Sequence, residues 1–451
     1  MHHGTEEQPT VWAERFCPGG FCLQTDTWGA GGTSFLRAAK AAERMVFMRN
    51  RWLIALAAVG IHISIGSVYA WSVLTRPIMA QLGFSLAETT WAFSLAILFL
   101  GFSAGFLGKY VEKYGPKRSG LVSMCFFGAG MLGTALALFL GSLPLLYLFY
   151  GVIGGIGLGV GYITPVSTLV KYFPNHRGFA TGLAIMGFGF AALIAGPLMQ
   201  YLTARFGLVE NFLILGVCYM VLIGASALYL KAPAQPAGKG AVTKRLRGAT
   251  AAEAMRTWQF GALWWVFFVN ITCGIGLLAV ASPMAQEVVG MDAAQAASMV
   301  GIIGLLNGGG RILWSTLSDY LGRGFTYMLF FALEIGAFAL LSGTHDALVF
   351  QLLVLLIISC YGGGFSCMPA YLSDLFGTRE LSAIHGRVLT AWGVAGVVGP
   401  TLVSLLRERT QGYTTILLFF AGLFIVNFAV ATVLKFYGKR QAAAALRQAC
   451  V

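Results

Sequence analysis

One arginine, Arg311, lies in the middle of an apolar stretch of this chain, directly after three glycines at positions 308–310. A charged side chain inside a bilayer costs roughly 2.5–3.5 kcal/mol or more, so it is usually retained for a function. A guanidinium stays protonated and holds a carboxylate through two parallel hydrogen bonds. The placement predicts a polar cavity in which Arg311 binds a small carboxylate. The structural alternative is a side chain that extends toward Asp319, about two turns further on, and reaches the membrane surface.

Three aromatic residues in other apolar stretches are candidate partners for such a carboxylate. Tyr69 and Trp71 lie in the first stretch, and Tyr162 lies in the fourth. A phenol donates a hydrogen bond to a carboxylate, and aromatic rings exclude water from a small anion. The alternative for all three is packing between helices, which is the commoner role of an aromatic side chain.

Two ionisable residues inside apolar stretches are candidate proton sites. His62 precedes Tyr69 by seven residues, so the two share a helix face. A histidine titrates near neutral pH, although a buried, hydrogen-bonded histidine is the simpler interpretation. Glu334 is an acid in the middle of another apolar stretch, which makes it a functional candidate by default.

The composition is that of a multi-pass membrane protein. Hydrophobic residues make up 57% of the chain and charged residues only 10%, whereas a soluble domain carries about 25% charged residues. Twelve apolar stretches each approach the ~20 residues that a transmembrane helix needs. The predicted fold is therefore an all-α membrane protein with twelve transmembrane helices in two six-helix pseudo-repeats.

The net charge of +13 is spread over alternate loops rather than gathered in one patch, which argues against nucleic acid as a partner. The positive-inside rule predicts that both termini lie in the cytoplasm, and the expected location is the cell (inner) membrane. Only four basic residues fall in the predicted outer loops: Arg76, Arg205, Arg407 and Arg409.

These patterns divide the chain into five segments. Residues 1–48 form a polar N-terminal extension that we expect to be disordered, and residues 49–230 form the first six-helix half. Residues 231–259 are a basic linker with prolines and glycines, which predicts flexibility. Residues 260–437 form the second half, and residues 438–451 form a cytoplasmic tail.

The two predicted halves repeat one another after their second helix. Glu112 and Gly115 match Asp319 and Gly322 at one offset. Basic residues follow in both copies, at Arg118 and at Arg323. Glu112, Arg118, Asp319 and Arg323 are therefore predicted to form gate contacts at the inner face, with a solvated loop as the alternative.

The first copy of this repeat, from Gly108 through Glu112 and Gly115 to Lys117 and Arg118, resembles the signature of the major facilitator superfamily. The resemblance implies two six-helix bundles that rock about a central site. It also implies that the helix of Glu334 is peripheral, which favours a protonated, structural role for this acid.

Three segments resemble the oxalate:formate antiporter family within this superfamily, namely residues 66–77, 362–377 and 385–396. The resemblance implies that an arginine at the position of Arg311 binds the substrate carboxylate. Oxalate carriers of the family use a lysine at the position of Trp392, so we expect Trp392 to close the site, with bulky packing as the alternative. One central cation suits a monoanion. Proton-coupled monocarboxylate carriers have an acid where this chain has Asn307.

The sequence therefore predicts a monocarboxylate transporter (formate, lactate or pyruvate class) that works by exchange and alternating access. The alternatives are proton symport through His62 or Glu334, oxalate/formate exchange, and a membrane sensor without transport. The spans contain no convergent nucleophile, base or metal ligands, so we expect no enzymatic activity, cofactor or metal. The expected partners are a small carboxylate and the lipid bilayer, and the expected state is a monomer.

Overall fold

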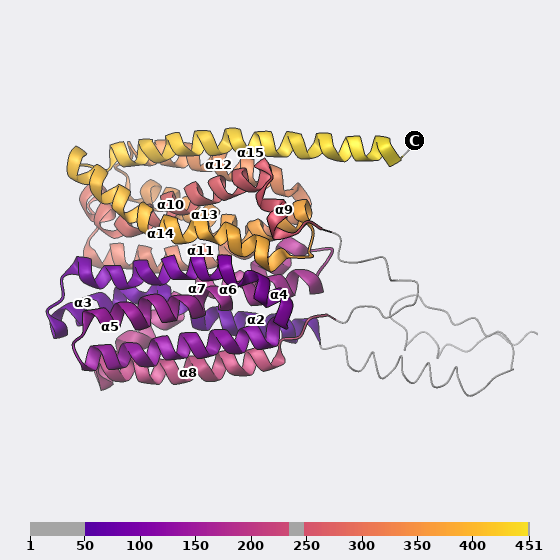
Figure 1. Ribbon diagram of the computed structural model, residues 1–451. Helices are drawn as coiled ribbons and strands as arrows, with labels where there is room; N and C mark the ends of the chain where they lie inside the picture. Colours follow the sequence, from indigo (N-terminus) through magenta and orange to yellow (C-terminus); the bar gives the residue numbers. More distant parts are fainter. Residues whose placement is uncertain (1–49, 234–247, 450–451) are drawn as a thin grey trace, which may run out of the picture. The chain divides into compact units, whose positions relative to one another are not determined.

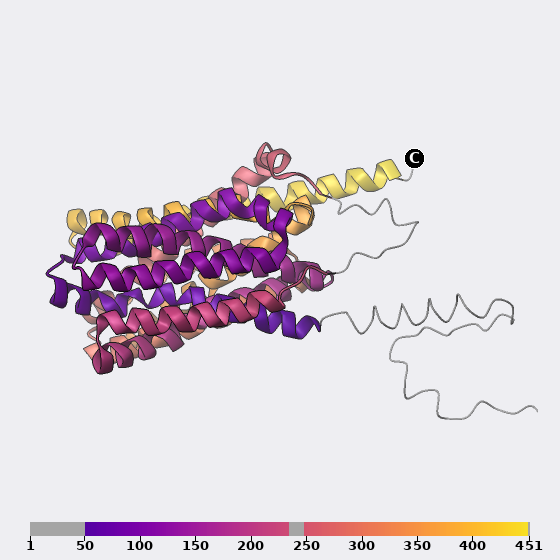
Figure 2. The same cartoon turned by 60° about the horizontal axis from the view of Figure 1, so that its bottom comes forward.

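The computed structural model describes residues 50–233 and 248–449. Within these residues the chain is almost entirely helical, and the long helices run side by side (Figures 1 and 2). The N-terminal extension lies outside the described residues, as do residues 234–247 of the predicted linker.

The first part of the described chain contains these elements: α2 (Arg51–Gly66), η2 (Ser67–Ala70), α3 (Trp71–Leu82), α4 (Leu86–Phe139), α5 (Leu143–Leu146), η3 (Tyr147–Gly154), α6 (Gly155–Tyr172), α7 (Arg177–Phe206) and α8 (Leu208–Tyr229). The second part contains α9 (Ala251–Met255), α10 (Trp258–Val289), α11 (Ala293–Leu321), α12 (Arg323–Leu341), α13 (Ala347–Phe376), α14 (Leu381–Thr410) and α15 (Thr414–Ala449).

Ten continuous helical segments in the described part of the chain are long and apolar enough to cross a membrane. One of them, α4, has 54 residues and is interrupted at Gly115, so it supplies two spans. Helix α11 has 29 residues and is also long enough to cross. The described residues thus provide the twelve predicted transmembrane helices.

The break in α4 has a counterpart between α11 and α12. Gly115 has φ 80° and ψ 167°, and Gly322 has φ 84° and ψ 141°. Residues with a Cβ are disfavoured in this region, so glycine permits a sharp turn between two helices at both places. These are the two glycines that the sequence repeat aligned.

The most extensive contacts between the first set of helices and the second are those of α4 with α14 and of α7 with α11. Both depend on close backbone approach. A Cβ on Gly101 would lie 2.7 Å from the nitrogen of Gly393, and a Cβ on Gly189 would lie 2.6 Å from the Cα of Gly308. Small residues permit such contact between membrane helices.

The end of the predicted linker is structured. Ala249 donates a backbone hydrogen bond of 2.8 Å to the carbonyl of Phe376, and the amide of Ala251 donates one of 2.8 Å to Glu380. The Thr250 backbone and hydroxyl hydrogen bond to Glu253, which lowers the pKa of that carboxyl, and this capping pair starts α9. Residues 248–251 therefore dock on the turn between α13 and α14. We call the end of the bundle that carries this turn the gate end (right in Figure 1).

Candidate anion-binding site and gate

Arg311 is completely buried, with 0% of its surface exposed. Its Nη1 donates a hydrogen bond of 3.2 Å to the carbonyl of Ile185 on α7, and its Nε donates one of 3.3 Å to Oδ1 of Asn307. Its Nη2 has no partner. No ion pair in the described part of the chain includes Arg311. The side chain therefore stays inside the bundle instead of reaching the membrane surface, and it carries a charge without a counter-ion.

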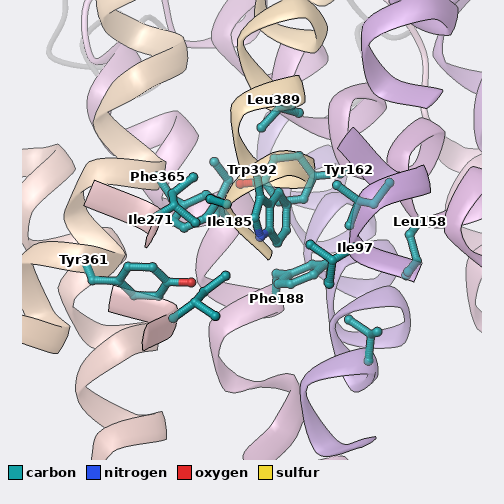
Figure 3. Packing of buried hydrophobic residues seen from close by; sticks show 14 of the residues in the cluster. Ile97, Leu158, Tyr162, Ile185, Phe188, Ile271, Tyr361, Phe365, Leu389 and Trp392 are labelled. Carbon is teal, nitrogen blue, oxygen red and sulfur yellow. The ribbon is translucent and has the colours of Figure 1, made fainter. Parts of the chain in front are cut away.

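Aromatic rings from α7 and α13 enclose the guanidinium. Its Cζ lies 5.7 Å from the ring centre of Phe188 and 5.2 Å from that of Phe365. Trp392 on α14 contacts both rings, at 5.5 Å and 4.8 Å between centroids. Figure 3 shows Trp392 between Phe365 on one side and Tyr162 on the other. Such a setting strengthens the field of the cation because it excludes water.

Tyr162 and Tyr69 complete this enclosure from the first set of helices. The ring of Tyr162 on α6 lies 5.2 Å from Trp392 and 5.5 Å from Phe188. The ring of Tyr69 on η2 lies 5.1 Å from Phe188, and its hydroxyl lies 3.4 Å from that of Tyr361 on α13. The six side chains that pack together here come from six elements, and we call this group the central chamber: Tyr69, Tyr162, Phe188, Arg311, Phe365 and Trp392.

Several polar groups of the central chamber are buried without a hydrogen-bond partner. They are Arg311 Nη2, Tyr162 OH and Trp392 Nε1. Buried polar groups in folded proteins are nearly always paired, so a cluster of exceptions calls for an explanation. The arginine and tryptophan nitrogens only donate hydrogen bonds, and a phenol can donate one. Unpaired donors on neighbouring side chains, together with an uncompensated cation, suit an anion.

Two histidines flank Tyr162. The ring of His62 on α2 lies 5.2 Å from Tyr162, and that of His385 on α14 lies 6.1 Å away. The Nδ1 of His62 lies 3.2 Å from the carbonyl of Ala58, which assigns the proton to Nδ1. The Nε2 atoms of both histidines are buried and unpartnered.

Two of the candidate site residues predicted from the sequence, Trp71 and Glu334, lie outside the central chamber. Trp71 packs on Tyr150 at 4.1 Å between ring centres, and its Nε1 donates a 3.2 Å hydrogen bond to the carbonyl of Thr89. Glu334 is buried on α12 and accepts a weak 3.4 Å hydrogen bond from Asn270 on α10. These two side chains belong to packing within each set of helices, whereas Asn307 lies next to Arg311.

Sequence reasoning did not identify Phe188, Tyr361, Phe365 or His385. Phe365 and His385 lie in the segments that resemble the antiporter family, which was a usable signal, and Tyr361 directly precedes one of these segments. Nothing in the local sequence distinguishes Phe188 from the other phenylalanines of the chain.

The predicted gate acids bind the amino ends of helices from the other set. Oε1 of Glu112 accepts hydrogen bonds from the amide of Ser382 (3.1 Å) and from its hydroxyl (2.8 Å), at the start of α14. Asp319 accepts hydrogen bonds of 2.9 Å from the amides of Gly178 and Phe179, at the start of α7. A carboxylate is stabilised at a helix amino terminus by the free amides and the helix dipole.

The basic partners of these acids differ from the predicted set in one position. Arg323 binds Asp319 and also Asp374, the latter at 3.1 Å. Glu112 pairs with Lys171 at 2.7 Å. Arg118 is exposed, and no ion pair of the described residues includes it. Lys171, rather than Arg118 as the repeat suggested, is thus the basic partner of Glu112.

The central chamber and the gate define a multi-pass helical membrane protein with a buried cation between two sets of helices that are locked together at one end. The sequence profile of the Major Facilitator Superfamily matches residues 53–400, and the chain belongs to this superfamily.

Similar proteins cover most of the chain. It is 29% identical over 388 residues to the oxalate:formate antiporter of Oxalobacter formigenes, an alignment that spans 85% of this chain and 91% of the relative. It is 29% identical over 355 residues to YhjX, an uncharacterised MFS-type transporter of Escherichia coli. This alignment covers 78% of this chain and 87% of the relative. It is 25% identical over 367 residues to monocarboxylate transporter 4 of Gallus gallus. This alignment covers 78% of this chain and 76% of the relative.

The fold also matches solved structures of this superfamily. The fucose:proton symporter of Escherichia coli superposes with a TM-score of 0.68 over 86% of this chain and 99% of that chain, at 15% identity. The profile match and the relatives confirm the predicted family, and the superposition confirms the all-helical fold class. At this identity the superposition carries no information about the substrate.

Proposed function

We propose that this protein is a secondary transporter of small monocarboxylate anions that works by exchange and alternating access. The observation that supports this most directly is the buried, uncompensated charge of Arg311, with Nη2 free beside the free donors of Tyr162 and Trp392. A carboxylate bound there would satisfy these donors and the charge together.

The transport cycle follows from where the charges lie. A carboxylate enters from the end opposite the gate and binds Arg311, which neutralises a cation in a low-dielectric chamber. The rings of Phe188, Phe365 and Trp392 then exclude water. The two sets of helices then rock against each other where α4 crosses α14 and α7 crosses α11. The hydrogen bonds of Glu112 and Asp319 to helix amino termini break, and the central chamber opens at the gate end. The return with an empty, uncompensated Arg311 is unfavourable, so reloading with a second anion gives exchange.

The size and charge of the substrate follow from Trp392. Its buried indole stands at the position where the resemblance to oxalate carriers implies a lysine, and Arg311 is the only Lys or Arg among the six side chains of the central chamber. We therefore infer a preference for formate, lactate or pyruvate over oxalate. We infer from the distribution of basic residues over the loops that the gate end and both termini face the cytoplasm.

Counterflow into proteoliposomes tests this function. Vesicles loaded with unlabelled pyruvate are diluted into labelled formate, lactate, pyruvate or oxalate. We expect uptake of the monocarboxylates above that of oxalate, and no counterflow for Arg311→Lys, whose ammonium lacks the planar fork. Preferential oxalate uptake would refute the inference from Trp392, and the absence of any uptake by the wild type would favour a sensor.

A second candidate is proton symport, which the free Nε2 of His62 beside Tyr162 favours. Glu334 is the other candidate carrier, but it packs between α10 and α12. Uptake driven by a pH gradient, compared between wild type, His62→Gln and Glu334→Gln, separates the two. If the wild type accumulates the substrate against its concentration gradient and only His62→Gln abolishes this accumulation, the protein is a symporter that uses His62. If the wild type accumulates no substrate, exchange is the transport mode.

A further inference from the structure

A groove of about 260 Å³ lies where α4 meets α9, α10 and α14. It is separate from the central chamber, and its walls are mostly apolar. It is lined by Phe102, Gly105, Phe106, Met255, Phe260, Trp264, Arg387 and Thr390. Arg387 is the only charged side chain among them.

Arg387 links the two sets of helices across this groove. Its Nε donates a 2.7 Å hydrogen bond to the carbonyl of Gly105 on α4, and its Nη1 lies 3.2 Å from the sulfur of Met255 on α9. Its Cζ lies 5.7 Å from the ring centre of Phe106. No ion pair within residues 50–233 and 248–449 includes Arg387. A guanidinium without a carboxylate thus stands at the edge of an apolar groove.

The residues and helices around the groove indicate which kind of ligand it can bind. Helices α4, α10 and α14 are long and apolar enough to cross a membrane, so we expect a groove between them with exposed apolar walls to face lipid. Phe106 is 61% exposed and Met255 is 43% exposed, which leaves the apolar rim uncovered by protein. Arg256, the residue after Met255, is exposed and adds a second cation near the rim. An occupant needs an apolar chain and an anionic head.

We propose that this groove binds an anionic phospholipid, with its phosphate at Arg387 and part of an acyl chain along Phe102, Phe106 and Trp264. Basic pockets between membrane helices are suited to anionic headgroups, and tryptophan is favoured at the level of the headgroups. The site is independent of which solute the central chamber carries.

Binding here has a consequence for the conformational cycle. Arg387 and Gly105 hold α14 against α4, one of the two crossings that must move when the halves rock. A lipid seated on both helices stabilises the arrangement in which they are close. Anionic lipid therefore favours the state that is closed at the gate end.

The experiment is a lipid titration of the purified full-length protein by native mass spectrometry, with phosphatidylglycerol and phosphatidylcholine of identical chains. We expect the wild type to bind phosphatidylglycerol more tightly. Arg387→Gln should weaken phosphatidylglycerol binding about fivefold, the value of one basic residue near the membrane surface, and leave phosphatidylcholine unchanged. Arg387→Lys keeps the charge and should stay within about twofold of the wild type.

Lys117→Gln is the matched control, because Lys117 is exposed and also lies at the gate end, outside the groove. The proposal is overturned if Arg387→Gln keeps the preference for phosphatidylglycerol, or if Lys117→Gln loses as much. It is also overturned if Arg387→Lys behaves like Arg387→Gln, which would indicate a structural role. Inorganic phosphate should not displace the lipid; displacement at millimolar phosphate would indicate a site for the free anion and would equally overturn it.

Discussion

Asp319 makes the sharpest prediction about the gate. Its side chain is only 5% exposed, and both of its oxygens accept backbone hydrogen bonds from the start of α7 while it also binds Arg323. The substitution Asp319→Asn keeps the shape but removes the charge. It also turns one acceptor into an NH₂ group that faces a backbone amide.

The magnitude follows from the bonds that are lost. Hydrogen bonds to charged groups contribute about 1.5–3 kcal/mol each. One such bond is lost outright, the other loses its charge, and Arg323 keeps only Asp374 as an anion. A loss of about 2–3 kcal/mol in the state closed at the gate end is therefore expected, which shifts the equilibrium toward the open state by about 30- to 150-fold.

Cys367 provides a native reporter for this shift. Its side chain is completely buried on α13 beside Ser318, just inside the gate. The assay measures the rate at which a polar maleimide labels Cys367 in purified protein. The background replaces the remaining cysteines by serine or alanine: Cys17, Cys22, Cys125, Cys218, Cys273, Cys360 and Cys450.

We expect Asp319→Asn to raise the labelling rate of Cys367 by about 30- to 150-fold, because labelling requires the open state. Glu408→Gln makes the same chemical change at an exposed position in the last turn of α14 and should leave the rate unchanged. An unchanged rate in Asp319→Asn, with the control also unchanged, would refute the role of this acid as a gate lock.

Three other substitutions test separate parts of the structure. Trp392→Lys places a second cation in the central chamber and should raise oxalate counterflow relative to pyruvate by about tenfold, the value of one charge-assisted bond; an unchanged ratio would contradict the charge argument for monoanions. Trp71→Phe removes the bond to Thr89 and should lower thermal stability by about 1 kcal/mol without changing substrate affinity, since Trp71 packs on Tyr150; a loss of affinity at unchanged melting temperature would return Trp71 to the substrate site. Gly189→Ala forces a Cβ against Gly308 and should cost about 1–3 kcal/mol in a thermal unfolding assay, whereas Gly304→Ala on α11 meets no atom within 4 Å and should be neutral.

The features that depend on the cost of burying charge and polar backbone could be predicted from the sequence. Hydropathy alone located the twelve spans, because a membrane tolerates few other arrangements. Arg311 stood out because a guanidinium in an apolar stretch needs a reason. The breaks at Gly115 and Gly322 were visible as a repeat, and the structure gives both glycines the same backbone conformation.

The features that depend on which face of a helix turns inward were harder to predict. Tyr69 and Trp71 are two residues apart, and residues at this spacing do not share a helix face. Tyr69 accordingly faces Phe188, whereas Trp71 faces Tyr150. His62 and Tyr69 are seven residues apart, and both rings contact Phe188, at 6.3 Å and 5.1 Å.

The gate illustrates the limit of a repeat as a guide. Arg323 follows Asp319 by four residues, a spacing at which two side chains on a helix meet. Arg118 follows Glu112 by six residues and lies beyond the break at Gly115. The partner of Glu112 is instead Lys171 on α6, and nothing in the sequence around Glu112 indicates this pairing.

The central claim is that the guanidinium of Arg311 binds the carboxylate of the transported anion. Equilibrium binding of labelled pyruvate to purified protein tests it most directly, with wild type compared to Arg311→Gln and Arg311→Lys of matched thermal stability. We predict saturable binding to the wild type and a loss of at least about tenfold in affinity for both variants, since each lacks the bidentate charged partner. Wild-type affinity in Arg311→Gln would contradict the account.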